Sequence, residues 1–290
     1  MSTPGAVVIG GYANGVSAVR GLAREGVRTA VILTSECDIA QHSRYAHEAH
    51  RVHYLNRRPD GLIDLLDAQR ERWRGWALIP TNDYALAALA KYRDMLSRSY
   101  SVTVPEEEIT RRVLDKSVTY RFAAEVGVDL PRSYGPASRQ TAARLDLVFP
   151  MVVKPLQSAR FWEVFGKKLL VVHDRPELFA AVDRVEAAGM HAEVLDLIPG
   201  SDGNVYSYTV YLNRWGEPVA ELASRKLRKA PRHFGVGRAS IACDAPQLRD
   251  RTLALLKRLE WRELACVEYK LDDRDGLYRL MEINGRCPLS

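Results

Sequence analysis

The sequence lacks the features that mark a membrane-spanning or secreted protein. No apolar run in its 290 residues approaches the roughly 20 that a membrane-spanning helix requires. The first residues, MSTPGAVVIGG, contain no basic segment and no cleavage signature, so they predict no secretory peptide. The 4 cysteines form no Cys-x-x-Cys pair, which argues against a zinc ribbon or a disulfide framework. We therefore expect a cytoplasmic protein with no membrane partner.

Charge of one sign is not concentrated anywhere in the sequence. The formal net charge is +6, but lysine and arginine are spread over the whole chain and interleaved with aspartate and glutamate. There is no basic tail and no stripe of aromatic residues alternating with basic ones, so we expect no nucleic-acid partner. With 47% hydrophobic and 27% charged residues, the composition is that of a globular protein. The modest positive balance suits the binding of an anionic ligand such as a nucleotide.

The first third of the sequence predicts a parallel α/β unit. Residues 6–11 form an apolar run that ends in two glycines, residues 15–26 have helical periodicity, and residues 27–33 form a second apolar run. This β-α-β opening implies a parallel sheet. A G-x-G-x-x-G dinucleotide fingerprint would need glycine where Tyr12 stands, so we expect a plain strand-to-helix turn there.

Two further strands and a helix are expected to complete this unit. Residues 77–80 and 102–105 predict strands, and residues 84–96 predict a helix that Thr81-Asn82-Asp83 caps. The unit thus spans about the first hundred residues.

Four histidines, His42, His47, His50 and His53, crowd one segment of this unit. Spacings of three can align side chains on a helix, so a metal site is one interpretation. No cysteine and no carboxylate beyond Glu48 completes a ligand set, and neighbouring arginines would oppose a cation. We favour solvated or capping histidines.

Residues 264–286, LACVEYKLDDRDGLYRLMEINGR, predict a hairpin with chemistry on one face. Two short apolar runs flank DDRDG, whose aspartates and glycine are typical turn residues. If Glu268 pairs with Glu282, five residues, Asp273 to Leu277, connect the strands. Strand alternation then places Glu282 and Asn284 on one face, with Glu268 opposite them.

Two carboxylates and an amide oxygen gathered in this way form the all-oxygen cluster that Mg²⁺ prefers. A further two residues along the strand, Arg286 adds a fixed positive charge. The alternative is a surface hairpin with solvated charges. The combination of Glu268 with Glu282-x-Asn284-x-Arg286 favours the metal site.

This combination resembles the metal-binding end of the ATP-grasp ligases, a superfamily that includes biotin carboxylase, carbamoyl-phosphate synthetase and D-alanine–D-alanine ligase. Matching segments precede it in the family order. Asp115-Lys116 stands at the start of a predicted helix that ends before Gly127-Val-Asp-Leu-Pro131, and residues 149–155 form a β-branched strand that presents Lys154 before a proline. Residues 192–200 resemble the hinge strand of the family.

The resemblance implies a role for each matching residue. It implies that Lys116 and Lys154 contact the phosphates of ATP, and that Glu268, Glu282 and Asn284 bind Mg²⁺, with Mn²⁺ as an alternative. The hinge residues expected to hydrogen-bond adenine are Leu195, Asp196, Leu197 and Ile198, and Asp202 is expected to face the ribose. Arg286 is expected to stabilise the reaction intermediate. Arg225 and Lys226, in a basic cluster before residues 231–237, either face the γ-phosphate or belong to a solvated surface.

The resemblance also implies the fold. We expect an α/β protein in which an ATP-grasp fold follows a small parallel-sheet domain, with domains at residues 1–108, 109–190 (small lobe) and 191–290 (large lobe). The segment 156–168 departs from the family, because it has one glycine and carries Phe161 and Trp162 where relatives have a glycine-rich phosphate lid. The sequence stops 6 residues after Asn284, so we expect a large lobe that is incomplete or completed by a partner.

By resemblance, the function is that of an ATP-dependent carboxylate–amine ligase. Such an enzyme converts a small carboxylic acid into an acyl phosphate with release of ADP, and an amine then forms an amide or peptide-like bond. Ligases of the D-aspartate ligase kind fit best, because the chain lacks the glycine-rich lid and has no biotinyl domain. The alternatives are a biotin-carboxylase or carbamoyl-phosphate type of enzyme that activates bicarbonate, and a catalytically degenerate ATP-binding protein. A homodimer stays open.

Overall fold

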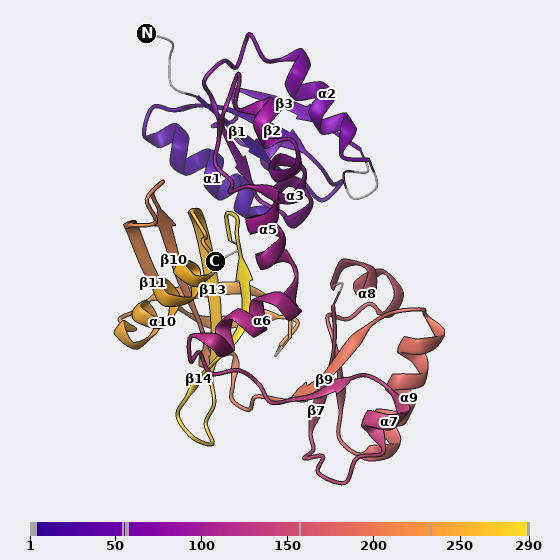
Figure 1. Cartoon of the computed structure of the whole chain (residues 1–290). Coiled ribbons are helices and arrows are strands. Elements are labelled where there is room, and N and C mark those ends of the chain that lie inside the picture. Colours follow the sequence, from indigo (N-terminus) through magenta and orange to yellow (C-terminus); the bar gives the residue numbers. More distant parts are fainter. Residues whose placement is uncertain (1–4, 54, 56–57, 157, 233, 289–290) are drawn as a thin grey trace.

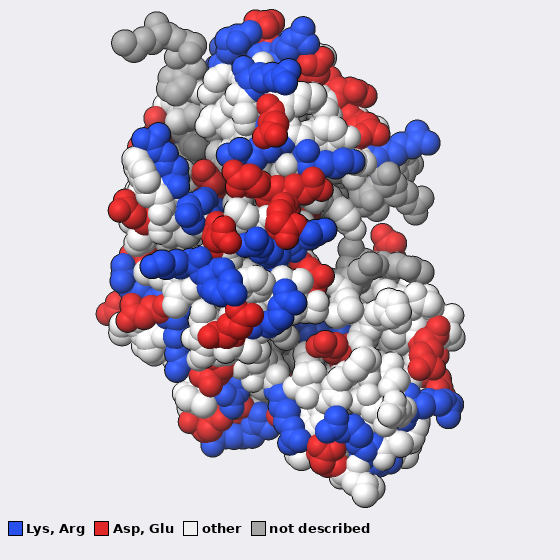
Figure 2. All heavy atoms as spheres, in the orientation of Figure 1, with Lys and Arg blue, Asp and Glu red and all other residues white. Residues whose placement is uncertain are grey.

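Three β-sheets organise the chain, two of five strands and one of four (Figure 1). The structure is a computed structural model, and it describes residues 5–53, 55, 58–156, 158–232 and 234–288. Basic and acidic side chains are interspersed over the face shown in Figure 2. Within the described ranges, no helix combines the length and the apolar character needed to cross a membrane.

The first sheet is parallel, with the strand order β3-β2-β1-β4-β5. Its strands are β1 (Gly5–Ile9), β2 (Arg28–Leu33), β3 (Glu48–Arg51), β4 (Ala77–Pro80) and β5 (Ser101–Val102). The helices of this unit are α1 (Ala13–Arg24), the short 3-10 helix η1 (Ala40–His42), α2 (Asp60–Ala68), α3 (Asp83–Lys91) and α4 (Arg93–Leu96). The central strands β1 and β2 are buried almost throughout, as expected where helices cover both faces of a sheet. The predicted β-α-β opening and parallel sheet are confirmed.

Two local predictions for this unit need correction. The single helix expected over residues 84–96 is two helices that meet at Tyr92, although its cap is present, since the Asn82 side chain accepts a hydrogen bond from the Ala85 amide. The last strand is only two residues long. The histidine-rich segment forms η1 and the edge strand β3, so the helical alignment behind the disfavoured metal alternative does not form.

The second sheet is antiparallel, with the order β6-β9-β7-β8, and it forms the smaller lobe at the lower right of Figure 1. Its strands are β6 (Ser133–Pro136), β7 (Met151–Pro155), β8 (Leu170–Val172) and β9 (Ala192–Asp196), and its helices are α7 (Arg139–Ala142), α8 (Ser158–Phe165) and α9 (Arg175–Ala187). The segment that departs from the family's glycine-rich lid contains α8, whose Phe161 is fully buried and contacts Phe165 at 4.4 Å between ring centres. Aromatic packing against the lobe therefore replaces the glycine-rich loop.

The third sheet is antiparallel, with the order β12-β11-β10-β13-β14. Its strands are β10 (Val205–Leu212), β11 (Pro218–Ala230), β12 (Val236–Ala242), β13 (Glu263–Leu271) and β14 (Tyr278–Asn284), and η2 (Asp202–Asn204) and α10 (Pro246–Arg258) accompany them. The strand β11 continues to Ala230, so the basic cluster from Arg225 to Lys229 lies on a strand and not in the loop that the sequence suggested.

Two consecutive helices, α5 (Glu107–Leu114) and α6 (Lys116–Glu125), lead along the chain from the first sheet to the second. In space they pack between the first sheet and the third. One apolar cluster runs through Leu78 of the first sheet, Val113 of α5 and Leu280 of the third sheet. The second sheet has a separate core. The predicted division at residues 108 and 190 stays a proposal, and β9 of the second sheet lies just beyond the second of these boundaries.

Two glycines of α1 provide a matched test of this packing. A Cβ at Gly15 would lie 2.1 Å from the Gly10 carbonyl oxygen, whereas a Cβ at Gly21 meets nothing within 4 Å. We expect Gly15→Ala to lower the free energy of unfolding by about 1–3 kcal/mol through overpacking against the backbone. Gly21→Ala should raise it by about 0.5–1 kcal/mol, since alanine is the better helix former. Urea unfolding measures both, and a Gly15→Ala variant as stable as the parent would contradict this packing.

Candidate functional site

A cavity of about 230 Å³ lies between the second and third sheets. Strands β7 and β9 form one wall, and β11, β13 and β14 form the other. Most residues that the motifs singled out line it: Lys116, Lys154, Leu195, Asp196, Leu197, Ile198, Lys226, Glu268, Glu282, Asn284 and Arg286. These residues are up to 170 positions apart in the sequence (116 to 286), so the fold gathers them. Arg225 and Asp202 are not among the lining residues.

The hairpin of β13 and β14 pairs Glu268 directly with Glu282, as the sequence predicted. Its register shifts after that pair, because Tyr269 faces Leu280 and Met281 is an extra residue in β14. The connection is therefore residues 272–277, one residue longer than expected. This bulge was not predictable from the alternation of residue types.

The bulge places a main-chain acceptor at the cavity wall. The Met281 carbonyl oxygen accepts hydrogen bonds from the Tyr120 hydroxyl at 3.0 Å and from Lys154 Nζ at 2.9 Å. Lys154 Nζ also donates to the Tyr120 hydroxyl oxygen at 2.5 Å. Lys154, on β7 of the second sheet, is thus attached to β14 of the third sheet and to α6.

The two paired carboxylates are surrounded by lysines. Lys226 Nζ donates to Glu268 Oε2 at 2.6 Å, and both side chains are largely buried. Burial of Glu282 opposes its ionisation, but the charges of Lys116, Lys168 and Lys154 outweigh it and lower the pKa of Glu282 to about 2. Glu282 therefore carries its negative charge at every physiological pH.

The lysines themselves are held in a poorly hydrated place. Burial lowers the pKa of Lys154, of Lys116 and of Lys270. It also lowers the pKa of Lys229 to about 8, and the neighbouring charge of Lys226 acts in the same direction. Burial makes the charged form of these lysines unfavourable, and a bound polyanion would stabilise it. The cluster of lysines therefore favours the binding of a polyanion.

The sequence left open whether Arg225 or Lys226 faces the phosphates, and the alternation of side chains along β11 distinguishes them. Lys226 is buried and lines the cavity, whereas the side chain of Arg225 is exposed. Neighbouring residues of a strand point to opposite faces of the sheet, so only one of the two can face the cavity. The structure does not bring Arg225 to the site.

The hinge segment lines the opposite end of the cavity. Leu195 and Ile198 are buried, and the Asp196 carboxylate accepts a hydrogen bond from the Tyr134 hydroxyl at 2.9 Å. The Ile198 carbonyl oxygen accepts a hydrogen bond from Lys270 Nζ at 2.7 Å. Asp202 lies outside this lining, where its carboxylate accepts the Lys229 main-chain amide at 3.0 Å.

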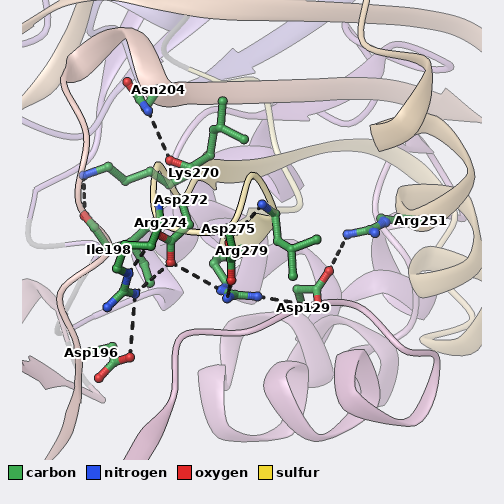
Figure 3. A network of polar contacts seen from close by, with 12 residues as sticks. Asp129, Asp196, Ile198, Asn204, Arg251, Lys270, Asp272, Arg274, Asp275 and Arg279 are labelled. Carbon is green, nitrogen blue, oxygen red and sulfur yellow. Dashed lines mark hydrogen bonds and ion pairs between the residues drawn. The ribbon is translucent and has the colours of Figure 1, made fainter. Parts of the chain in front are cut away.

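A polar network connects this hinge to the hairpin turn (Figure 3). Arg274 lies between Asp272, at 2.7 Å, and Asp196 of the hinge, at 3.7 Å. Arg279 lies between Asp272 and Asp129, at 3.7 and 3.6 Å. The hydrogen bond from Arg274 lowers the pKa of Asp272 although its side chain is fully buried. Arg274, predicted only as a turn residue, therefore also contacts the hinge.

Sequence reasoning missed three lining lysines, Lys168, Lys229 and Lys270. Lys270 and Glu268 are two positions apart on β13, so alternation from Glu268 could have identified it. Lys229 belongs to the basic cluster of β11, from which the sequence analysis assigned roles only to Arg225 and Lys226. Lys168 follows α8 and has no local signal.

The donor set at the paired carboxylates fits Mg²⁺. Within the described part of the chain, no three His, Cys, Asp or Glu side chains cluster in a way that could hold a metal by themselves. Two carboxylates and the Asn284 amide leave further positions for phosphate oxygens and water, which Mg²⁺ usually keeps. Glu268 already holds one cation, the Lys226 ammonium, which shows that positive charge is accommodated there.

Comparisons with known proteins give a consistent result. A scan against models of protein families gives no match. The sequence is 24% identical over 238 residues to a D-aspartate ligase of Enterococcus faecium (strain Aus0004), a match that covers 77% of this chain and 56% of that protein. The chain thus spans just over half the length of this curated relative.

Solved structures of several ligases and carboxylases share the fold. An L-amino acid ligase from Bacillus licheniformis matches 98% of this chain and 67% of its own, with a TM-score of 0.71 and 17% identity. A biotin carboxylase from Campylobacter jejuni, solved as a β,γ-ATP complex, matches 98% of this chain and 65% of its own, with a TM-score of 0.72 and 15% identity. An N5-carboxyaminoimidazole ribonucleotide synthetase in its ADP complex gives a TM-score of 0.72 at 14% identity, over 98% of this chain and 70% of its own. The resemblance that the motifs predicted is confirmed, and the chain has the ATP-grasp fold.

Proposed function

We propose that this chain is an ATP-dependent carboxylate–amine ligase. The observation that carries the proposal is the Glu268–Glu282 pair, which lies among lysines in a cavity between two lobes. The sequence similarity to a D-aspartate ligase and the fold shared with an L-amino acid ligase support small carboxylic acids and amines as its substrates. Neighbouring structures described as ADP complexes support a nucleotide in this cavity.

In this proposal the cavity holds ATP with its base at the apolar hinge and its phosphates among the lysines. Leu195 to Ile198 provide an apolar wall and main-chain groups for adenine. Lys116 and Lys154 are point charges on flexible stems, which suit phosphate oxygens. The role of Asp202 at the ribose stays a prediction, since its carboxylate accepts the Lys229 amide.

Glu268, Glu282 and Asn284 would hold Mg²⁺, which neutralises charge on the phosphates. The carboxylate oxygen of the acid attacks the γ-phosphorus, ADP leaves, and an acyl phosphate forms. An amine nitrogen then attacks the acyl carbon, loses a proton, and inorganic phosphate leaves. Lys226 and Arg286 would stabilise the negative charge that develops at the transferring group.

The proposal also includes a cellular location and an oligomeric state. The cysteines Cys37, Cys243, Cys266 and Cys287 are free, which suits the reducing cytoplasm predicted from the sequence. A homodimer also stays a proposal. It is supported only by analogy with the ligase fold, which occurs in dimeric carboxylase domains.

Calorimetric titration with ATP, with and without Mg²⁺, tests the metal assignment. We expect Mg²⁺ to increase the affinity of the parent protein for ATP. In Glu282→Gln that increase should shrink at least about tenfold, or about 1.4 kcal/mol, because a neutral amide is a poor ligand for Mg²⁺. Glu186→Gln, an exposed change on α9, is the matched control. An unchanged Mg²⁺ dependence in Glu282→Gln would contradict the assignment.

Neighbouring substitutions on β11 test the role of Lys226. Hydroxylamine traps acyl phosphates as hydroxamates, so their formation from ATP and a panel of amino acids reports the first step. Lys226→Met should slow it by about 10²–10³-fold, or roughly 3–4 kcal/mol, the usual effect of removing a group that stabilises transition-state charge. Arg225→Met should leave the rate within about twofold, because Arg225 is exposed on the other face. Similar losses in both variants would refute the assignment, provided that both melt like the parent.

The titration of Lys229 tests whether phosphates enter the cavity. Its pKa is about 8 without a ligand, because burial disfavours the charged ammonium. Bound phosphate favours that charged form, so ATP should raise the pKa. Nuclear magnetic resonance of ¹³C-methylated lysines measures the titration, Lys229→Arg assigns the resonance, and exposed Lys91 is the control. A pKa of Lys229 that ATP leaves unchanged would contradict a phosphate site there.

A further inference from the structure

The bulge of β14 makes a main-chain carbonyl available to other elements of the chain. Met281 is the extra residue of this bulge, and such a residue is left unpaired in the ladder. A carbonyl oxygen that is withdrawn from water needs another partner. The Met281 carbonyl oxygen has two, the Tyr120 hydroxyl at 3.0 Å and Lys154 Nζ at 2.9 Å. The bulge therefore creates an acceptor for two side chains.

The Tyr120 hydroxyl completes a triangle of hydrogen bonds with these groups. Lys154 Nζ donates to the hydroxyl oxygen at 2.5 Å, and the hydroxyl donates its hydrogen to the Met281 carbonyl oxygen. Burial and the negative charges of Glu282 and Glu193 raise the pKa of Tyr120, so the hydroxyl keeps this hydrogen. Two acceptors with defined positions thus hold the ammonium group.

The triangle fixes the direction of the remaining donor of Lys154. An ammonium group has three N–H donors, and in the part of the chain that the structure describes two of them have these acceptors. Because the bonds of a tetrahedral nitrogen have a fixed mutual geometry, two directed bonds set the direction of the third. Lys154 lines the cavity between the second and third sheets, so a ligand there meets an ammonium that is already ordered.

Tyr120 stands behind Lys154 and outside this cavity. Among the described residues it does not belong to the lining of the large cavity; it lines a neighbouring cavity of about 10 Å³, together with Lys116, Lys154 and Glu193. A space of that size holds at most one water molecule. Any effect of Tyr120 on a ligand in the large cavity must therefore pass through a residue such as Lys154.

The triangle also joins two separate cores. Tyr120 packs against the apolar cluster that includes the third sheet, whereas Lys154 lies on β7 beside Val153, which belongs to the core of the second sheet. Rotation of the second sheet away from the third would take Lys154 from both acceptors. Its ammonium is therefore oriented only while the two lobes are together.

From this geometry we propose that Tyr120 is a positioning residue for the nucleotide: with the Met281 carbonyl it orients the Lys154 ammonium so that the third N–H faces a phosphate of ATP. The proposal rests on the ligase function proposed above, in which Lys154 contacts the phosphates. It makes the affinity for ATP depend on a hydroxyl group that touches no part of the nucleotide.

A double-mutant cycle tests whether Tyr120 acts through Lys154. Calorimetry gives the Kd for ATP with Mg²⁺ of the parent, Tyr120→Phe, Lys154→Met and the double variant, all below the onset of melting. Tyr120→Phe should weaken binding at least about fivefold, because a charged donor loses one of its two acceptors. Lys154→Met should weaken it at least about tenfold. The double variant should bind within about twofold of Lys154→Met, since the hydroxyl then has no ammonium to orient.

Three results of this cycle would overturn the positioning role. In the first, Tyr120→Phe binds ATP like the parent. In the second, Lys154→Met does so. In the third, Tyr120→Phe weakens binding by the same factor with and without Lys154, as a general loss of packing would.

Tyr100→Phe is the matched control. Tyr100 is buried in the first unit, and its hydroxyl donates to the Leu66 carbonyl oxygen at 2.6 Å, so this variant also loses a hydrogen bond from a tyrosine to the main chain. It should melt at a lower temperature than the parent and bind ATP within about twofold of it. A loss of affinity as large as that of Tyr120→Phe would show that reduced stability, and not the position of Lys154, weakens binding.

The two proposals fail in different ways. A parent protein that binds no ATP would overturn both. If the parent binds ATP and forms hydroxamate, but Tyr120→Phe has no effect or an effect that does not depend on Lys154, only the positioning role fails.

Discussion

The structure depends on two carboxylates that face each other on neighbouring strands. Glu268 and Glu282 are directly opposite in the register of β13 and β14, an arrangement in which like charges repel. It is tolerated because Lys226 contacts Glu268 and the charges of several lysines keep Glu282 ionised in spite of burial. The lysines in turn outnumber the carboxylates, and burial makes them costly to keep charged. A polyanionic ligand and a divalent cation together would satisfy both sets of charges, whereas either one alone would satisfy only half.

One hairpin serves both ends of the cavity. At its strands it carries the paired carboxylates, and at its turn the buried Asp272 holds Arg274, which reaches Asp196 of the hinge (Figure 3). Between them, Lys270 holds the Ile198 carbonyl oxygen. The hairpin of β13 and β14 thus contacts both the hinge, where adenine is proposed to bind, and the carboxylates, near which the phosphates are proposed to bind. Movement of the hinge against the third sheet must therefore break the ion pair between Arg274 and Asp196 and the hydrogen bond of Lys270, which restrains the opening between the lobes.

Local patterns predicted those parts of the site that depend on alternation and capping. The pairing of Glu268 with Glu282 follows from strand periodicity and turn residues, and α6 starts at Lys116 as predicted, where the Asp115 side chain caps it. The bulge at Met281 was beyond such reasoning, because its partners, Tyr120 and Lys154, come from other elements. The helix α8 was also missed, since the family resemblance suggested a loop while burial of its aromatic face decided the structure. Tertiary packing, not local preference, settled both.

The position of Arg286 explains why the first sheet belongs to the functional unit. The strand β14 ends at Asn284, and the following residues leave the third sheet and lie against the end of β4 and the start of α1. Had the segment stayed solvated, Arg286 would have been free to adopt many rotamers, and its charge would have been screened by water. Asp83 removes that freedom by an ion pair across a separation of 203 residues. The cost of ordering a long side chain is thus met by folding of the protein before any ligand binds, which is the physical basis of a preorganised site.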